Sequence, residues 1–249
     1  MIITKDSPDK TLPDLPSKDN SPPPYAPSDP SSSSSVPPFA PPDGIQPSNY
    51  VSLNQNHHSV EGTYLLDPSL EIPNEFLAPL PDGIESEDSR SNFYGSSNHG
   101  NVSAMLYLLN KPMHKSRNKV LLNTCSTHGT VSTCVRRGGL LPAFDLKSKT
   151  QNGNVLVKIP RTYRGMITGT TKHGRVWMSD AVSAQAVVFS DVEGTKRIFV
   201  GDFKARNDET DDSMVLETVH GIVMIYFENE DLTHPVVKKM KGLLNKFRR

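Results

Sequence analysis

One short module recurs five times between residues 97 and 225. Its copies read SNHGNVSA (97–104), STHGTVST (126–133), TQNGNVLV (150–157), TKHGRVWM (171–178) and TVHGIVMI (218–225). In every copy a Ser or Thr stands three residues before the glycine, a Val two residues after it, and an apolar residue seven residues before it. Such a period is typical of repeat proteins, in which each unit buries its apolar face against its neighbours.

The residue types in the module predict a strand–turn–strand unit. Glycine, and to a lesser degree Asn and His, tolerates the left-handed backbone that a type I′ hairpin turn requires. In such a hairpin the Ser/Thr and Val positions face each other and share their side with the upstream apolar position, which is Phe93, Leu122, Leu146, Ile167 or Met214. The opposite side carries Ser103, Ser132, Lys147, Lys149 and Glu217. We therefore expect one core face and one solvated face.

The repeat predicts an all-β domain over residues 49–231, built as a β-solenoid-like or two-sheet stack. A Greek-key sandwich is an alternative that the pattern leaves open. The gap between the last two glycines is about twice the others, and its strand-like runs, 186–190 and 197–203, suggest a degenerate sixth unit. Residues 49–53 and 62–68 also alternate, so we expect them to be strands that cap the open end of the stack.

Residues 1–48 form a tail rich in Pro and Ser. A segment of this composition cannot offset its ordering entropy by burial, so we predict disorder with polyproline II character. Within it, Pro22, Pro23 and Tyr25 fit the Pro-Pro-x-Tyr ligand of WW domains. The alternative is that a proline-rich tail with one tyrosine produces this match by chance.

Residues 232–249 predict a short basic amphipathic helix. Its apolar positions fall on one face: Val236, Val237, Met240, Leu243, Leu244 and Phe247. Two interpretations remain open. The helix covers one end of the β domain with its lysines in solvent, or it binds an anionic membrane surface or a partner groove. In the second case the contact residues would be Lys238, Lys239, Lys241, Phe247 and Arg248.

The succession GTYLLDPSLEIP, SRSNFYGSSNHGNVSA, NGNVLVKIPRTYRG and HGRVWMS resembles a family of fungal proteins that carry a domain of unknown function. The resemblance covers about Asn49 to Asp231 and implies an all-β fold without established catalytic residues. The repeat is also similar to adhesin-type domains with Asn-Gly-x-Val repeats. Most copies here have His in place of that Asn, so we expect the turn to be kept with a different side chain presented.

The composition and the missing motifs argue against several functions. Lys+Arg and Asp+Glu both total 27, so no field that would attract nucleic acid is expected. The chain has no Walker loop, no Gly-x-Ser-x-Gly elbow and no His-Glu-x-x-His motif. We therefore expect a non-enzymatic protein-interaction module without a cofactor. The alternatives are a structural or adhesin-like binder that acts through an exposed β face, and an enzyme whose site is not visible as a motif.

Several residues are of types that could bind a metal ion or take part in thiol chemistry. Four histidines occupy equivalent turn positions, and we interpret them as exposed turn formers and not as metal ligands: His99, His128, His173 and His220. Cys125 and Cys134 flank one turn and are predicted to be inert, reduced thiols, diagonal neighbours on the polar face of a hairpin. The acidic stretch from Asp202 to Asp212 is predicted to be a solvated loop.

The N-terminal residues Met1 to Thr11 contain no apolar run of the kind found in a secretory signal. With two cysteines in the chain, this suggests an intracellular protein with reduced thiols. The expected location is the cytoplasm, with a peripheral membrane contact if the C-terminal helix binds lipid.

Overall fold

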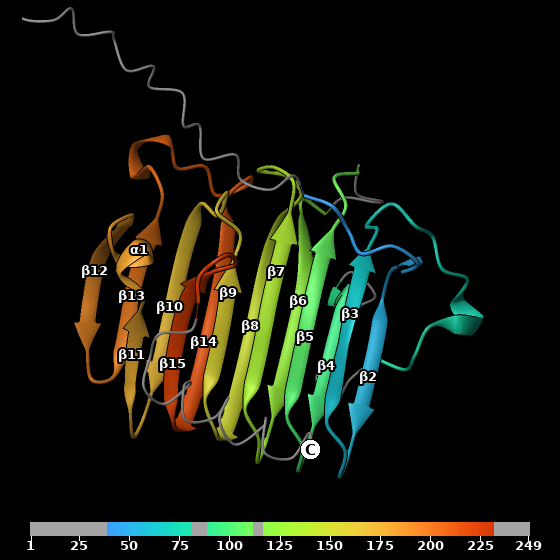
Figure 1. Cartoon of the computed structure of the whole chain (residues 1–249), viewed down its shortest axis with the longest axis horizontal. Helices are drawn as coiled ribbons and strands as arrows, with labels where there is room; N and C mark the ends of the chain where they lie inside the picture. The colour runs from blue at the N-terminus through green and yellow to red at the C-terminus, as the bar shows by residue number, and fades with distance from the viewer. Residues whose placement is uncertain (1–38, 81–88, 112–116, 232–249) are drawn as a thin grey trace, which may run out of the picture. The chain divides into compact units, whose positions relative to one another are not determined.

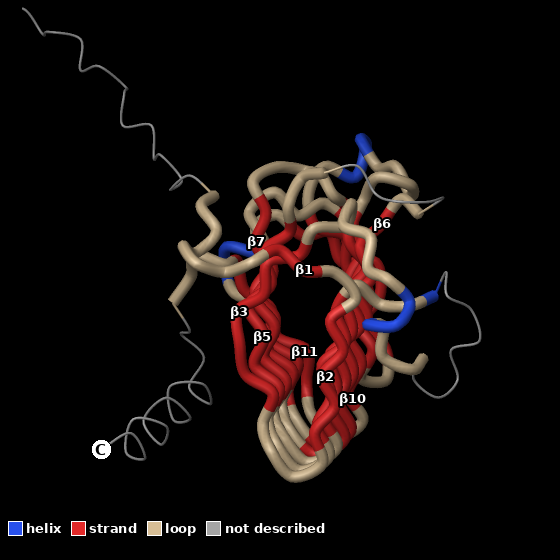
Figure 2. Tube along the Cα trace, turned by 90° about the vertical axis from the view of Figure 1, so that its right-hand side faces the viewer, coloured by secondary structure: helices blue, strands red, loops and turns tan. Residues whose placement is uncertain are grey.

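The computed structural model describes residues 39–80, 89–111 and 117–231. Most of these residues lie in strands, which form two sheets stacked face to face (Figures 1 and 2). Helix among the described residues is limited to α1 (Asp180–Ser183) and to short 3-10 turns such as η1 (Asn74–Phe76) and η3 (Phe203–Ala205). The predicted all-β fold is confirmed.

The two sheets are nearly equal in size. Sheet A has seven strands in the order β1 (Pro47–Ser48), β3 (Val60–Leu66), β5 (Val102–Leu108), β7 (Val131–Arg137), β9 (Val155–Ile159), β15 (Ile222–Phe227) and β11 (Arg175–Met178). Sheet B has eight strands in the order β12 (Ala186–Val192), β13 (Thr195–Val200), β10 (Gly165–Thr171), β14 (Asp212–His220), β8 (Ala143–Asn152), β6 (Lys119–Ser126), β4 (Phe93–Ser97) and β2 (Val51–Gln55).

Each module forms an arch that links the sheets, and the predicted hairpin is wrong. The strand before the glycine belongs to sheet B and the strand after it to sheet A, as in β4 and β5 around Gly100. Neighbouring arches pair in parallel and in register, so that Phe93 lies opposite Leu122, which in turn lies opposite Leu146. Parallel pairing excludes the Greek-key sandwich, whose strands are antiparallel, and agrees with the predicted β-solenoid-like or two-sheet stack.

The arches do not stack in sequence order. The last arch, β14–β15, is inserted between β8–β9 and β10–β11, because β14 pairs with both β8 and β10, and β15 with both β9 and β11. At the other end, β2 and β3 are confirmed as strands and form a complete first arch.

The predicted sixth unit is also wrong. The strands β12 and β13 form an antiparallel hairpin at one edge of sheet B. Its two turn residues, Glu193 and Gly194, have φ of 48° and 76°. Positive φ at both positions is the mark of a type I′ turn, so the hairpin turn expected in the modules occurs here instead.

The two faces of the modules are as predicted. The apolar residues that precede the glycines all lie in the core between the sheets and are at most 2% exposed: Phe93, Leu122, Leu146, Ile167 and Met214. Successive side chains of a strand point to opposite sides, so the expected solvated set faces outward, with Ser103, Lys147 and Lys149 exposed.

The glycines of the modules are required by close approach between arches, since none of them has a left-handed φ. A Cβ on Gly129 would lie 2.2 Å from the carbonyl oxygen of Gly100, and one on Gly153 would lie 2.2 Å from that of Gly129. The Ser or Thr three residues before the glycine donates a hydrogen bond to the same carbonyl oxygen. Ser126 Oγ donates to the Gly100 oxygen at 2.8 Å, and Thr150 Oγ1 to the Gly129 oxygen at 2.7 Å. Glycine and hydroxyl together therefore join each arch to the one before it.

Candidate functional site

The outward face of sheet B presents polar side chains in rows that run across the strands. One row places Ser96, Cys125, Lys149 and Glu217 side by side on β4, β6, β8 and β14. A groove of about 440 Å³ opens at this row and is lined by Ser96, Ser97, Cys125, Ser126, Thr127, Lys149, Gln151 and Val219. The lining offers hydroxyl, thiol, amide and ammonium groups, which suit hydrogen bonding to an extended polar ligand.

The two cysteines lie on opposite outer faces, so their predicted placement on one face is wrong. Cys125 lies in the groove on sheet B, with its Sγ 3.3 Å from Ser96 Oγ. Cys134 lies on β7 in sheet A, pointing away from the core. Both thiols are free. Burial raises the pKa of the Cys134 thiol, with Arg136 opposing the rise, so its reactive thiolate form is disfavoured.

Histidines form a stacked column along the arch turns. The ring centroids of His57 and His99 are 5.2 Å apart and those of His99 and His128 are 5.0 Å apart, with nearly parallel planes. His220 and His173 stack at 4.8 Å, and Asn152 occupies the position between His128 and His220. His99, His128, His173 and His220 are exposed, as predicted, but none of them has the left-handed φ that the predicted type I′ turn requires.

This column does not have the geometry of a metal site. A metal ion lies close to the plane of each imidazole that binds it, because the nitrogen lone pair lies in that plane, and rings stacked in nearly parallel planes about 5 Å apart share no such plane. Across residues 39–80, 89–111 and 117–231, no group of three or more His, Cys, Asp or Glu side chains is placed to hold a metal ion.

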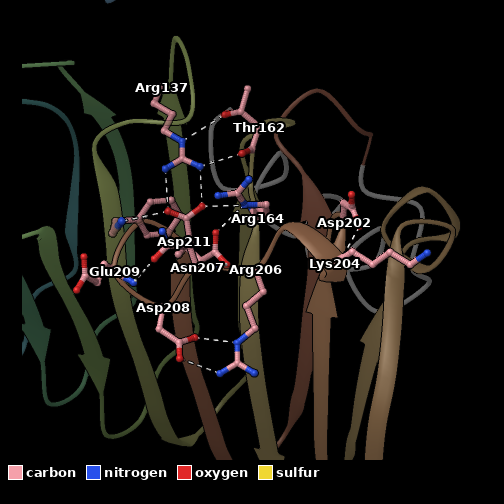
Figure 3. A network of polar contacts seen from close by, with 12 residues as sticks. Arg137, Thr162, Arg164, Asp202, Lys204, Arg206, Asn207, Asp208, Glu209 and Asp211 are labelled. Atoms are coloured by element: carbon pink, nitrogen blue, oxygen red, sulfur yellow. Dashed lines mark hydrogen bonds and ion pairs between the residues drawn. The ribbon is translucent and has the colours of Figure 1, made fainter.

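A buried ion pair lies at the opposite edge of the stack (Figure 3). Arg137, the last residue of β7, donates from Nη1 and Nη2 to the two carboxylate oxygens of Asp212 at 2.7 and 2.6 Å. The two side chains are 1% and 2% exposed. Further hydrogen bonds join the pair to the backbone of Pro142, Phe144, Thr162 and Arg164.

The Asp212 carboxyl is held in its ionised form by this geometry. Burial raises its pKa, while Arg137 and the backbone N–H groups of Phe144 and Arg164 oppose the rise. Both oxygens accept hydrogen bonds from N–H donors, which leaves neither of them placed to carry a proton. Burial also raises the pKa of the neighbouring Tyr163 well above its usual value, and its hydroxyl donates to the Met166 carbonyl.

The acidic stretch is therefore only partly the solvated loop that the sequence predicts. Asp211 is buried and accepts from Arg164 Nε at 2.6 Å, whereas Asp208 pairs with Arg206 in solvent (Figure 3). The prediction is wrong for Asp211 and Asp212. A signal for their partner was present, because Arg137 continues the inward alternation of Val131, Thr133 and Val135 and so places a charge at a core position.

This network lies at the edge of the stack opposite the arch turns, where loops connect one arch to the next; we call it the loop edge. Its buried side chains point into the stack. Its charged groups are paired with one another, as expected for a structural ion-pair cluster. The groove on sheet B is therefore the better candidate for contact with a ligand, because Ser96, Cys125, Lys149 and Gln151 in its lining face outward.

The contact residues predicted in the two terminal segments lie outside the described residues. They are Pro22, Pro23 and Tyr25 in the tail, and Lys238, Lys239, Lys241, Phe247 and Arg248 in the C-terminal segment. In the part of the chain that the structure describes, no helix has the length and apolar character needed to span a membrane.

Comparison with known proteins gives one result. No curated protein and no solved structure matches the chain. A family model, described as a domain of unknown function, DUF7330, matches residues 49–230. This range includes the five modules, the groove and the buried ion pair. The chain therefore belongs to the DUF7330 family.

Proposed function

We propose that the protein is a non-enzymatic interaction module that binds a partner through the outward face of sheet B. The observation that carries the proposal is the groove at Ser96, Cys125 and Lys149. Its lining comes from strands held in register by parallel pairing, so the polar groups are presented on a rigid surface. The resemblance of the repeat to adhesin-type domains supports an exposed β face as the binding surface.

The second part of the proposal concerns the tail. The Pro-Pro-x-Tyr sequence at Pro22, Pro23 and Tyr25 would recruit a WW-domain protein, since a preformed polyproline II segment binds an aromatic groove at low entropic cost. The tail would then bring one partner to a β domain that binds another.

Blocking the groove tests the first part. Gln151→Trp places a bulky side chain in the groove, and Ser103→Trp places the same side chain on the exposed outer face of sheet A. Proteins captured from an extract of the source cells should be lost with Gln151→Trp and kept with Ser103→Trp. If both variants capture the same proteins as the natural chain, sheet B is not the binding face.

Titration with a purified WW domain that binds Pro-Pro-x-Tyr peptides tests the second part. Tyr25→Ala should weaken binding by about tenfold or more, which corresponds to about 1.4 kcal/mol. Pro30→Ala changes a proline of the same tail outside the motif and should leave the affinity unchanged. Equal affinity of the Tyr25→Ala variant and the natural chain would exclude this ligand.

A further inference from the structure

A second apolar cluster lies on the outward face of sheet A. Leu156, Met224 and Tyr226 are buried there, with Trp177 and Ile222 packed against them. Met224 and Tyr226 alternate along β15 with Val223, Ile225 and Phe227, which belong to the core between the sheets. Strand side chains alternate, so this cluster faces away from that core. Leu156, Met224 and Trp177 are direct neighbours across β9, β15 and β11.

This cluster is buried although it lies on the outer face of sheet A. Met224 and Tyr226 expose 0% of their surface although they point away from the core. Within the sheet, the Trp177 ring lies against that of Tyr226 with 5.0 Å between the ring centroids, so neighbouring strands bury the flanks of these side chains. The outward row on sheet B differs, since Lys149 is exposed there.

The chain leaves β15 on this same side. Lys158 lies between Cys134 and Tyr226 in the outward row of sheet A, and its Nζ donates to the carbonyl oxygen of Glu230 at 2.6 Å. Ser179, directly after β11, donates to the Glu230 carboxylate at 2.8 Å. The last described residues are therefore fixed beside the cluster, with residues 232–249 still to follow.

We propose that residues 233–247 cover the outward cluster of sheet A. Their apolar positions would rest on the cluster with the lysines in solvent: Val236, Val237, Met240, Leu243, Leu244 and Phe247. A helix over this range is about 22 Å long, and the strands β9, β15 and β11 together span roughly 10 Å between their axes. The segment is thus long enough. A membrane would need the apolar face of the helix to be free. The inference does not depend on the proposed function.

Trp177 provides the test because it is the single tryptophan of the chain and belongs to the cluster. The variant Leu243→Asp/Leu244→Asp should shift its emission to the red and increase its quenching by acrylamide. The matched control, Lys241→Gln/Lys246→Gln, changes the polar side of the same segment and should leave the emission unchanged. The two free thiols add a second readout: Cys134 should react about tenfold faster in the Asp variant, while Cys125 on the other face should not change.

Hydrogen exchange on the natural chain without lipid makes the test independent of how the variants fold. The amides of residues 236–247 should be protected. Fast exchange of these amides, together with the same Trp177 emission in the natural chain and the Asp variant, overturns the proposal. Protection that arises only on addition of phosphatidylserine vesicles also overturns it and assigns the segment to the membrane surface.

Discussion

The two edges of the stack are held together in different ways. At the arch edge every module repeats one solution, in which its glycine approaches a backbone carbonyl of the neighbouring arch and its Ser or Thr hydroxyl donates to that same carbonyl, which is that of His58 for the first module and that of a glycine for the others. At the loop edge the connections differ in length and shape (Figure 2), and one buried pair, Arg137 and Asp212, joins segments 75 residues apart. Stability is therefore spread over many similar contributions at one edge and depends on a few ion pairs at the other, with the Arg137–Asp212 pair more buried than those of Asp211 and Asp67.

Breaking the ion pair between Arg137 and Asp212 should lower the free energy of unfolding more than any of the following changes. Asp212→Ala leaves the Arg137 guanidinium buried without a counter-ion, which costs about 3–5 kcal/mol. The midpoint of urea unfolding, measured with an unchanged slope, reports this loss. Asp208→Ala removes an acidic partner from the exposed pair with Arg206 and should not move the midpoint measurably. Equal shifts for the two variants would contradict the assigned role.

A methyl group in the arch turn should be the next most damaging change. Gly153→Ala would bring its Cβ within 2.2 Å of the Gly129 carbonyl oxygen, and the strain should cost about 1–3 kcal/mol. The control is Gly139→Ala, because a Cβ there meets nothing within 4 Å. Its unfolding free energy should stay within about 0.5 kcal/mol of the natural value. If Gly153→Ala left the unfolding free energy unchanged, the arches would be able to move apart without loss of stability.

Removing one of the Ser or Thr hydroxyls at the arch turns should lower the free energy of unfolding by a smaller amount. Thr150→Val keeps the shape of the buried side chain but loses its hydrogen bond to Gly129, so we expect a loss of about 1–2 kcal/mol. Thr168→Val, on the outward face of β10, is the matched control and should be nearly neutral. Chemical denaturation of both variants decides whether the repeated Ser/Thr stabilises the stack.

The smallest effect should be the pH dependence contributed by Asp67 at the loop edge. Burial by itself raises the pKa of this carboxyl, but hydrogen bonds from Lys111 and Ser69 outweigh it, so the pKa is lowered. A lowered pKa stabilises the fold above the unfolded value of about 3.9, and this contribution is lost as the pH falls through the folded value.

Asp67→Asn should therefore reduce the unfolding free energy at neutral pH by about 1 kcal/mol or less. The difference from the natural chain should disappear in acid. Urea midpoints collected across the acidic range would show this convergence, and a difference that stays constant with pH would argue against the ion pair with Lys111 as its cause.

The sequence predicts the faces of the strands well because the pattern is periodic. Positions such as Leu122 and Leu146 recur at a fixed distance from a glycine, and a strand side chain can only point to one of two sides. The sequence predicts a hairpin instead of an arch because a glycine needed for a left-handed φ cannot be distinguished, in a sequence, from a glycine needed where two backbones approach closely. Only the neighbouring arch, with the Gly100 carbonyl against Gly129, distinguishes them.

The candidate site was less predictable than the fold. The outward direction of Lys149 follows from the module, but the groove depends on Ser96, Cys125 and Lys149 being neighbours across three strands. Their register is a property of the assembled sheet. The pair formed by Arg137 and Asp212 was missed for the same reason, since nothing local in the sequence links the end of β7 to the start of β14.

The position of the last arch, β14–β15, between two earlier ones affects the order in which the strands can pair during synthesis. During synthesis β10 and β11 emerge before β14 and β15, yet in the finished stack they occupy positions beyond them. If β10 paired with β8 as soon as both were available, the place of β14 would be closed. The last third of the domain therefore cannot assemble in the order of translation. It must wait for residues 212–227, and an early pairing of β10 with β8 would have to be undone before the domain is complete.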